Sequence, residues 1–411
     1  MDSLTTDKAD RSTLLKVAES RVTEIAECIY KELNTNPYGA FGGLFGGNFG
    51  PLLFLFYYAD FSKDEKYALL AEQFLDKLLT HLESNLPGFS YSSGYAGMLY
   101  LFHFLQEKKF IDLDLSDSEE VIENYVIKQA RICMQVNDFD YFHGSLGVAL
   151  YFLRKNPSHP FLSEFIEFLY QRAEKDFVNH TVKWKTPFGR PEPVYDYHLS
   201  LSHGMTSIVL FLCRLLKTPS FRASDDCLTM LEGSMNYIVL QEIDHTQHGS
   251  FFPNNSLENN NHPMKSRLAW CFGDLGIAWT LWQAGVVIRN RHWQDKAIEI
   301  IEYSTKRITW DQTVVNDCGI CHGSAGIAMV FRRFYLEMRK KMFQDAWIHW
   351  IAFTLNFKRF DDGAAGFKTF ELQKGWKNDI SLLTGISGVG LSLLSFLRED
   401  LQEWDELFLL S

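Results

Sequence analysis

The sequence contains no run of lysine and arginine longer than three residues, and its formal net charge is -11 at pH 7. Proteins that bind nucleic acid chiefly through its phosphates need a basic surface, so nucleic acid is excluded as the main ligand. The longest apolar runs, such as PLLFLFYYA at 51–59, are much shorter than the ~20 residues of a membrane-spanning helix. The first residues also lack a basic segment followed by an apolar stretch. We therefore expect neither a signal peptide nor a transmembrane segment.

The sequence also lacks the cysteine pattern of a disulfide-stabilised protein. Its seven cysteines are an odd number and are scattered along the chain, which, without an export signal, indicates reduced thiols and a cytoplasmic location. The segment Cys318-Gly-Ile-Cys321-His322 has the spacing of a c-type haem attachment site and of a redox pair. Haem attachment normally follows export, and a redox pair is expected beside a βαβ pattern. Alternating strand patterns are scarce in this chain, so neither interpretation is favoured.

One short motif occurs seven times along the chain. Each copy has the form G-x-x-G, or a close variant, and each opens an apolar run. A single G-x-x-G carries almost no information, but seven copies that are all followed by apolar runs form an internal repeat. The first glycines of the copies are Gly47, Gly94, Gly144, Gly204, Gly273, Gly323 and Gly385. In the fourth copy Ser207 replaces the second glycine.

The runs and the segments between them predict paired helices. Each run after a motif is apolar on nearly all sides, as in a helix that is buried on most faces. The segments between the runs carry apolar residues at i, i+3, i+4 and i+7; examples are 66–84, 119–136, 160–177 and 292–308. An open array would need polar terminal repeats, whereas the last run is as apolar as the others. We therefore predict an all-α protein, a single domain over 1–411, in which seven inner and seven outer helices form an α/α toroid.

Two long polar connections, residues 179–201 and 244–267, lead into the fourth and fifth motifs. Connections of this length in a compact domain are usually functional or disordered. We expect them to form long loops that wall the rim and hold a substrate peptide.

In such a toroid the residues just before the first glycines gather at one rim. Histidine stands there in three copies, as His143, His203 and His322, and a cysteine stands one position earlier in two, as Cys271 and Cys321. Two thiolates and one imidazole, from Cys271, Cys321 and His322, are the ligand set of a catalytic zinc with an open fourth position. Sulfur and nitrogen donors suit zinc better than calcium or magnesium. The sequence therefore predicts one Zn²⁺ per chain.

Two similar residues are not expected to belong to this site. Cys318 lies outside the motif, and the pair His248-Gly249 opens no apolar run. A structural zinc would require a fourth protein ligand, and no motif position supplies one. A toroidal carbohydrate-active enzyme would require paired carboxylates at the rim, where this chain has cysteine and histidine.

The strings WCFGDLG, CHGSAG and LSHGMTS, on seven glycine-marked helix pairs, resemble the lanthipeptide cyclase family, the LanC-like proteins. The resemblance covers essentially the whole chain and implies an α/α toroid, in agreement with the repeat. It also implies a zinc-dependent enzyme that acts on a dehydrated precursor peptide. Such an enzyme adds cysteine thiols to dehydroalanine or dehydrobutyrine and so forms (methyl)lanthionine thioether rings.

The resemblance also assigns roles to individual residues. It implies zinc ligands at Cys271, Cys321 and His322, and catalytic residues at His203, Asp140 and Arg267. His203 would protonate the α-carbon, and Asp140 would orient that imidazole or stabilise its cation. Arg267 would stabilise the enolate oxygen or anchor Asp140. Trp270 is assigned to substrate binding. The resemblance does not reach His143, for which substrate binding and a structural role are equally compatible. Phe272 stands where family members often carry tyrosine.

A non-enzymatic function stays open, because some members of the family act as binding or adaptor proteins. The alternative is a non-catalytic adaptor that binds zinc and a thiol such as glutathione. The presence of Asp140, Arg267 and His203 favours catalysis. The chain has no dehydratase-like segment, so dehydration of the precursor is expected to be done by a separate protein.

Overall fold

The computed structural model describes residues 11–36, 43–82, 88–114, 116–188, 194–258, 264–401 and 403–411. Within them lie sixteen α-helices, one 3-10 helix and three two-stranded antiparallel hairpins. None of the described helices is long and apolar enough to span a membrane. The chain forms two compact units. The first unit comprises Met1–Gly88, Phe104–Leu113 and Ile308–Ser411, and the second comprises Phe89–His103 and Asp114–Arg307.

Each of the seven motifs opens a helix that is buried over most of its length, as predicted. These helices are α2 (Phe49–Ser62), α4 (Tyr95–Glu107), α6 (Ser145–Lys155), α8 (Met205–Leu216), α11 (Asp274–Val287), α14 (Ser324–Met338) and α16 (Ile386–Leu397). In the last five, the first glycine of the motif is the N-cap residue. Ser207, which replaces the second glycine of the fourth copy, is fully buried and donates its hydroxyl to the carbonyl of Gly204. The hydroxyl is thereby satisfied inside the helix.

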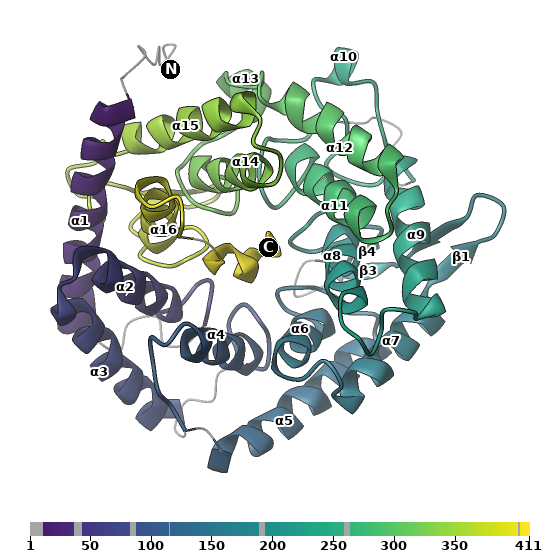
Figure 1. Cartoon of the computed structure of the whole chain (residues 1–411), viewed down its shortest axis with the longest axis horizontal. Coiled ribbons are helices and arrows are strands. Elements are labelled where there is room, and N and C mark those ends of the chain that lie inside the picture. Colours follow the sequence, from purple (N-terminus) through teal and green to yellow (C-terminus); the bar gives the residue numbers. More distant parts are fainter. Residues whose placement is uncertain are drawn as a thin grey trace. The chain divides into compact units, whose positions relative to one another are not determined.

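In the first unit, amphipathic helices cover the motif helices. α1 (Arg11–Thr35) packs on α16, α3 (Glu65–Leu82) packs on α2, and α15 (Lys341–Asn356) packs on α14 (Figure 1). The unit also contains α13 (Trp310–Thr313), the hairpin of β5 (Thr369–Glu371) and β6 (Gly375–Lys377), and the 3-10 helix η1 (Trp404–Phe408). α1 buries Leu14, Ala18, Val22, Ile25 and Ile29, which is the spacing of one helical face.

The last motif of the chain contacts the first within this unit. The backbone N–H of Leu383 donates to the carbonyl of Phe45 at 3.0 Å, and α16 packs on α2. A Cβ added to Gly50 would lie 2.5 Å from the Cβ of Leu382, so this close approach requires glycine. The two ends of the repeat array therefore meet, as expected for a closed array.

In the second unit, α11 packs on α12 (Arg291–Ser304) and α8 packs on α9 (Asp225–Val239). α6 contacts both α5 (Ser116–Gln135) and α7 (Pro160–Arg172). The amphipathic segment 119–136 was correctly predicted as a helix, whereas the helix predicted over 292–308 ends at Ser304. The helical prediction for 160–177 extends too far, because Glu174–Asp176 is strand β1 and pairs with β2 (Thr181–Lys183).

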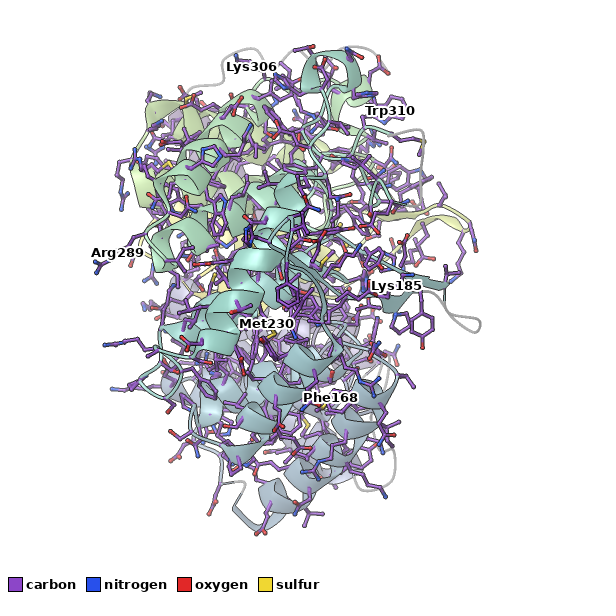
Figure 2. All side chains as sticks on the ribbon, turned by 90° about the vertical axis from the view of Figure 1, so that its right-hand side faces the viewer. Phe168, Lys185, Met230, Arg289, Lys306 and Trp310 are labelled. Atoms are coloured by element: carbon purple, nitrogen blue, oxygen red, sulfur yellow. The ribbon has the colours of Figure 1, made fainter. Side chains whose placement is uncertain are left out.

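The long connection 179–201 contains part of this hairpin and a second one, of β3 (Thr186–Phe188) and β4 (Val194–Asp196). β2 packs against α9, on which Met230 is fully buried (Figure 2). The exposed Lys185 lies between β2 and β3 and is labelled in the same view. Residues 189–193 and 259–263 of the two long connections lie outside the described residues. The proposed role of these connections at the rim stays a prediction.

A buried ion pair anchors the second connection. Asp274, the first residue of α11, is fully buried, and its Oδ2 lies 3.0 Å from Nη1 of Arg307, which is also buried. The Asp274 carboxylate accepts the backbone N–H groups of Phe251 and Phe252. Nη2 of Arg307 donates to the carbonyl of Ser266 at 2.5 Å. This pair therefore holds the polar connection that leads to Cys271 at Phe251–Phe252 and again at Ser266.

Candidate functional site

The residue just before each first glycine stays accessible to solvent. His143 is exposed, and His203, Phe272, His322 and Thr384 are half-buried. The glycine that follows each of these residues is buried. The prediction that these residues gather at one rim stays a prediction.

A feature that the sequence analysis missed is the residue six positions before the first glycine. Its carbonyl accepts the first N–H of the motif helix in four copies, at Asp138, His198, Asp317 and Asp379. In the three aspartates, Oδ1 also accepts a backbone N–H two residues later. The carbonyl bonds satisfy a helix N-terminal donor that the glycine N-cap cannot, and the Oδ1 bonds fix the turn before the helix. Extending the comparison of the seven motifs upstream would have shown this recurring aspartate.

Neighbouring motif turns are joined by backbone hydrogen bonds. In the second unit, Ser92 N donates to the carbonyl of Phe142 at 3.0 Å, and Leu201 N donates to that of Cys271 at 2.9 Å. The first bond places Ser92 beside the His143 turn, and the second joins the turn that carries His203 to the turn that carries Cys271. In the first unit, Cys321 N donates to the carbonyl of Leu383 at 3.0 Å.

Asp140 and His203, which are distant in sequence, form a hydrogen-bonded pair in the second unit. The Oδ2 of Asp140 lies 2.7 Å from Nδ1 of His203. Its Oδ1 accepts the backbone N–H groups of Phe142 and His143, both at 2.7 Å. Burial raises the pKa of Asp140, but the hydrogen bond from His203 and the nearby imidazoles of His203 and His143 outweigh it, so the pKa lies below its ordinary value. The carboxylate is thus held ionised against His203.

His143 is held next to this pair by a hydroxyl group. Ser92 Oγ lies 3.1 Å from Nδ1 of His143. The rings of His143 and His203 are nearly parallel, at 19° with centroids 6.0 Å apart. The structure thus places two imidazoles side by side, one paired with a carboxylate and one with a serine. Ser92 was not predicted, because a serine at this position carries no chemical signal by itself.

Trp270 is fully buried, and its side chain meets the histidines through Phe142. The rings of Trp270 and Phe142 are stacked, at 19° with centroids 6.0 Å apart. Phe142 in turn packs edge-on against His203, with centroids 5.2 Å apart. Arg267 is half-buried and lies one residue after Ser266, whose carbonyl is held by Arg307.

The three predicted metal ligands come from two turns. Cys271, in the second unit, is 3 % exposed and precedes Gly273, whose φ of 79° favours glycine. Cys321 and His322, in the first unit, are both half-buried. The Oδ2 of the buried Asp317 lies 3.7 Å from Nε2 of His322. Thiol and imidazole donors of this kind fit zinc, and three protein ligands are the number found at catalytic sites.

The chain was compared with known families and solved structures. A family model described as lanthionine synthetase C-like protein matches residues 42–409. The solved structure of nisin cyclase is similar at a TM-score of 0.74 and 19 % identity, with 94 % of this chain and 96 % of that chain covered. This likeness shows the fold. The prediction of an all-α protein of the α/α-toroid class is confirmed.

Proposed function

The chain belongs to the lanthionine synthetase C-like family, and from this premise we propose that it is a zinc-dependent lanthipeptide cyclase. It would add cysteine thiols of a dehydrated precursor peptide to dehydroalanine or dehydrobutyrine and so form (methyl)lanthionine rings. The observation that carries the proposal is the pairing of Asp140 with His203, on a turn hydrogen-bonded to that of Cys271. An acid-base pair beside a metal ligand is what thiol addition requires.

The donor set supports one zinc per chain, held by Cys271, Cys321 and His322. We propose that these three residues act as one ligand set, because thiolate and imidazole donors suit zinc. Two thiolates and a neutral imidazole would leave the fourth coordination position for substrate. Zinc held by these three residues would favour the deprotonated form of a substrate thiol in the fourth position.

His203 would supply the proton that completes the addition. Because Asp140 accepts the Nδ1–H of this imidazole, the proton exchanged with substrate is carried on Nε2. The ionised Asp140 fixes the tautomer and stabilises the imidazolium after it has taken up a proton. Asp140 itself is fixed by two backbone N–H groups, so the pair keeps its orientation without help from substrate.

The remaining predicted residues would position the peptide. His143, exposed and held by Ser92, would contact the substrate beside His203. Trp270 would act through Phe142, since its own ring is buried. Arg267 would place a positive charge near the enolate oxygen that forms during addition. We further propose that the enzyme works in the cytoplasm and receives its peptide from a separate dehydratase.

The metal content of the purified protein tests the ligand set. We expect about one zinc per chain by elemental analysis and loss of that zinc in Cys271→Ala, because two ligands do not retain a tetrahedral site. Cys318→Ala is the matched control: Cys318 is buried, three residues from Cys321, and outside the proposed set. Zinc retained in Cys271→Ala, or lost equally in the control, would contradict the ligand assignment.

The reaction itself is tested with a dehydrated peptide that carries one cysteine and one dehydroalanine. We expect the free thiol to disappear without a change in peptide mass, because addition forms a C–S bond and loses no atoms. The measurement is mass spectrometry after alkylation of the remaining thiols. An unchanged peptide, together with zinc-dependent binding of glutathione, would favour the adaptor function instead.

A further inference from the structure

We propose that Asp317 is a positioning residue that orients His322 so that Nδ1, and not Nε2, is the nitrogen offered to the metal. The inference rests on the proposed function, since it concerns a ligand of the proposed zinc. Asp317 lies five residues before His322, and no motif drew attention to it in the sequence.

The Asp317 carboxylate is held on both oxygens. The side chain is 1 % exposed. Its Oδ1 accepts the backbone N–H of Gly319 at 3.1 Å, and its Oδ2 accepts that of Phe370, at the β5–β6 hairpin, at 3.1 Å. A carboxylate fixed by two backbone donors cannot rotate to follow a moving partner, so the imidazole must adapt to it.

The edge of the His322 ring nearest this carboxylate is Nε2, at 3.7 Å from Oδ2. A carboxylate on one side of an imidazole favours the proton on the nearer nitrogen. In a neutral imidazole with its proton on Nε2, the lone pair is on Nδ1. Asp317 therefore selects the tautomer whose Nδ1 can bind a metal.

The chain contains its own control for this role. Asp379 stands at the same position in the seventh motif: Oδ1 accepts the N–H of Ser381 at 2.8 Å, and its carbonyl accepts the N–H of Ile386 at 3.0 Å. Asp317 makes the equivalent bonds in the sixth motif. Thr384 stands in the seventh motif where His322 stands in the sixth. Its hydroxyl donates to Asp379 Oδ2 at 2.7 Å. Asp379 thus builds the same turn without facing a metal ligand.

The first test is zinc affinity, measured by competition with a chromophoric chelator. In Asp317→Asn the amide oxygen can still accept the Gly319 N–H, but the amide NH₂ would face Nε2 of His322 and the Phe370 N–H. We expect zinc to bind about 10–100-fold more weakly, the usual effect of losing such a partner. Asp379→Asn should bind zinc as the wild type does. Equal weakening in the two variants, or none in Asp317→Asn, would overturn the proposal.

A second measurement needs no variant. The wild-type protein, loaded with ¹¹³Cd²⁺ in place of zinc and labelled with ¹⁵N-histidine, should show a cadmium coupling to a histidine Nδ1. Coupling to Nε2 would overturn the proposal even if Asp317→Asn failed to fold. A wild-type protein that binds neither metal would overturn this inference and the proposed function together. Normal zinc binding through Nε2 would overturn the inference alone.

Discussion

Replacing His203 with alanine is expected to slow ring closure by about 10²–10⁴-fold, the usual contribution of a general acid or base. The reason is geometric: Nδ1 of His203 is held by Asp140 at 2.7 Å, so the imidazole can present one defined nitrogen to the substrate. The rate is measured on the dehydrated peptide by mass spectrometry. The zinc content should stay at the wild-type level, because His203 is not a proposed metal ligand.

The matched control for this variant is His248→Ala. His248 also precedes a glycine, but it ends the short helix α10 (His245–His248), and Gly249 is the C-cap of that helix with φ 77°. We expect its cyclisation rate to stay within about twofold of wild type, in contrast to the ~10²-fold or larger loss in His203→Ala. Comparable losses in the two variants, or loss of zinc from His203→Ala, would remove His203 from the catalytic role.

Replacing Asp274 with asparagine is expected to lower the free energy of unfolding by about 3–5 kcal/mol, because the Arg307 guanidinium would be left buried without its counter-ion. Burial raises the pKa of Asp274 and lowers that of Arg307, in each case against the attraction of the other. Both shifts favour the neutral forms, so each charge depends on its partner to remain ionised inside the protein. The measurement is urea unfolding followed by circular dichroism.

An exposed pair with the same separation provides the comparison. Arg291 Nε lies 3.0 Å from Oδ1 of Asp295, with side chains 74 % and 59 % exposed. Asp295→Asn should therefore cost no more than about 1 kcal/mol. If Asp274→Asn cost no more than this control, the buried pair would contribute no more than a surface pair, and its role as an anchor of the connection to Cys271 would be wrong.

The helices could be predicted from sequence because they depend on local pattern. Apolar residues on all sides mark α16, and a stripe at helical spacing marks α12. The exposure of His143 was not predicted, because substrate binding and a structural role were equally compatible with its position. The helix predicted over 160–177 ended early because strand pairing with Thr181–Lys183, which period alone does not reveal, wins over helical propensity at Glu174–Asp176.

The contacts inside the site were less accessible to sequence reasoning. Asp140 was identified through the family resemblance, because its bond to His203 spans 63 residues and no local pattern encodes it. Ser92 depends on the turn of a neighbouring repeat and has no signature of its own. Asp317 did have a signal, since aspartate recurs six residues before the glycine in three copies. The aspartate lies six residues upstream of the first glycine and therefore outside the G-x-x-G motif that defines the repeat.

The bond between Leu383 and Phe45 has a consequence for how such a protein can change in evolution. An array with two separate ends can gain or lose a unit at either end, and only one junction changes. Here the last turn already donates to the first, and Gly50 fits tightly against Leu382, so a unit added at either end would have to break that junction. Insertions in connections such as 179–201 and 244–267 leave that junction and the number of repeats unchanged, and long loops tolerate them at a small cost in free energy.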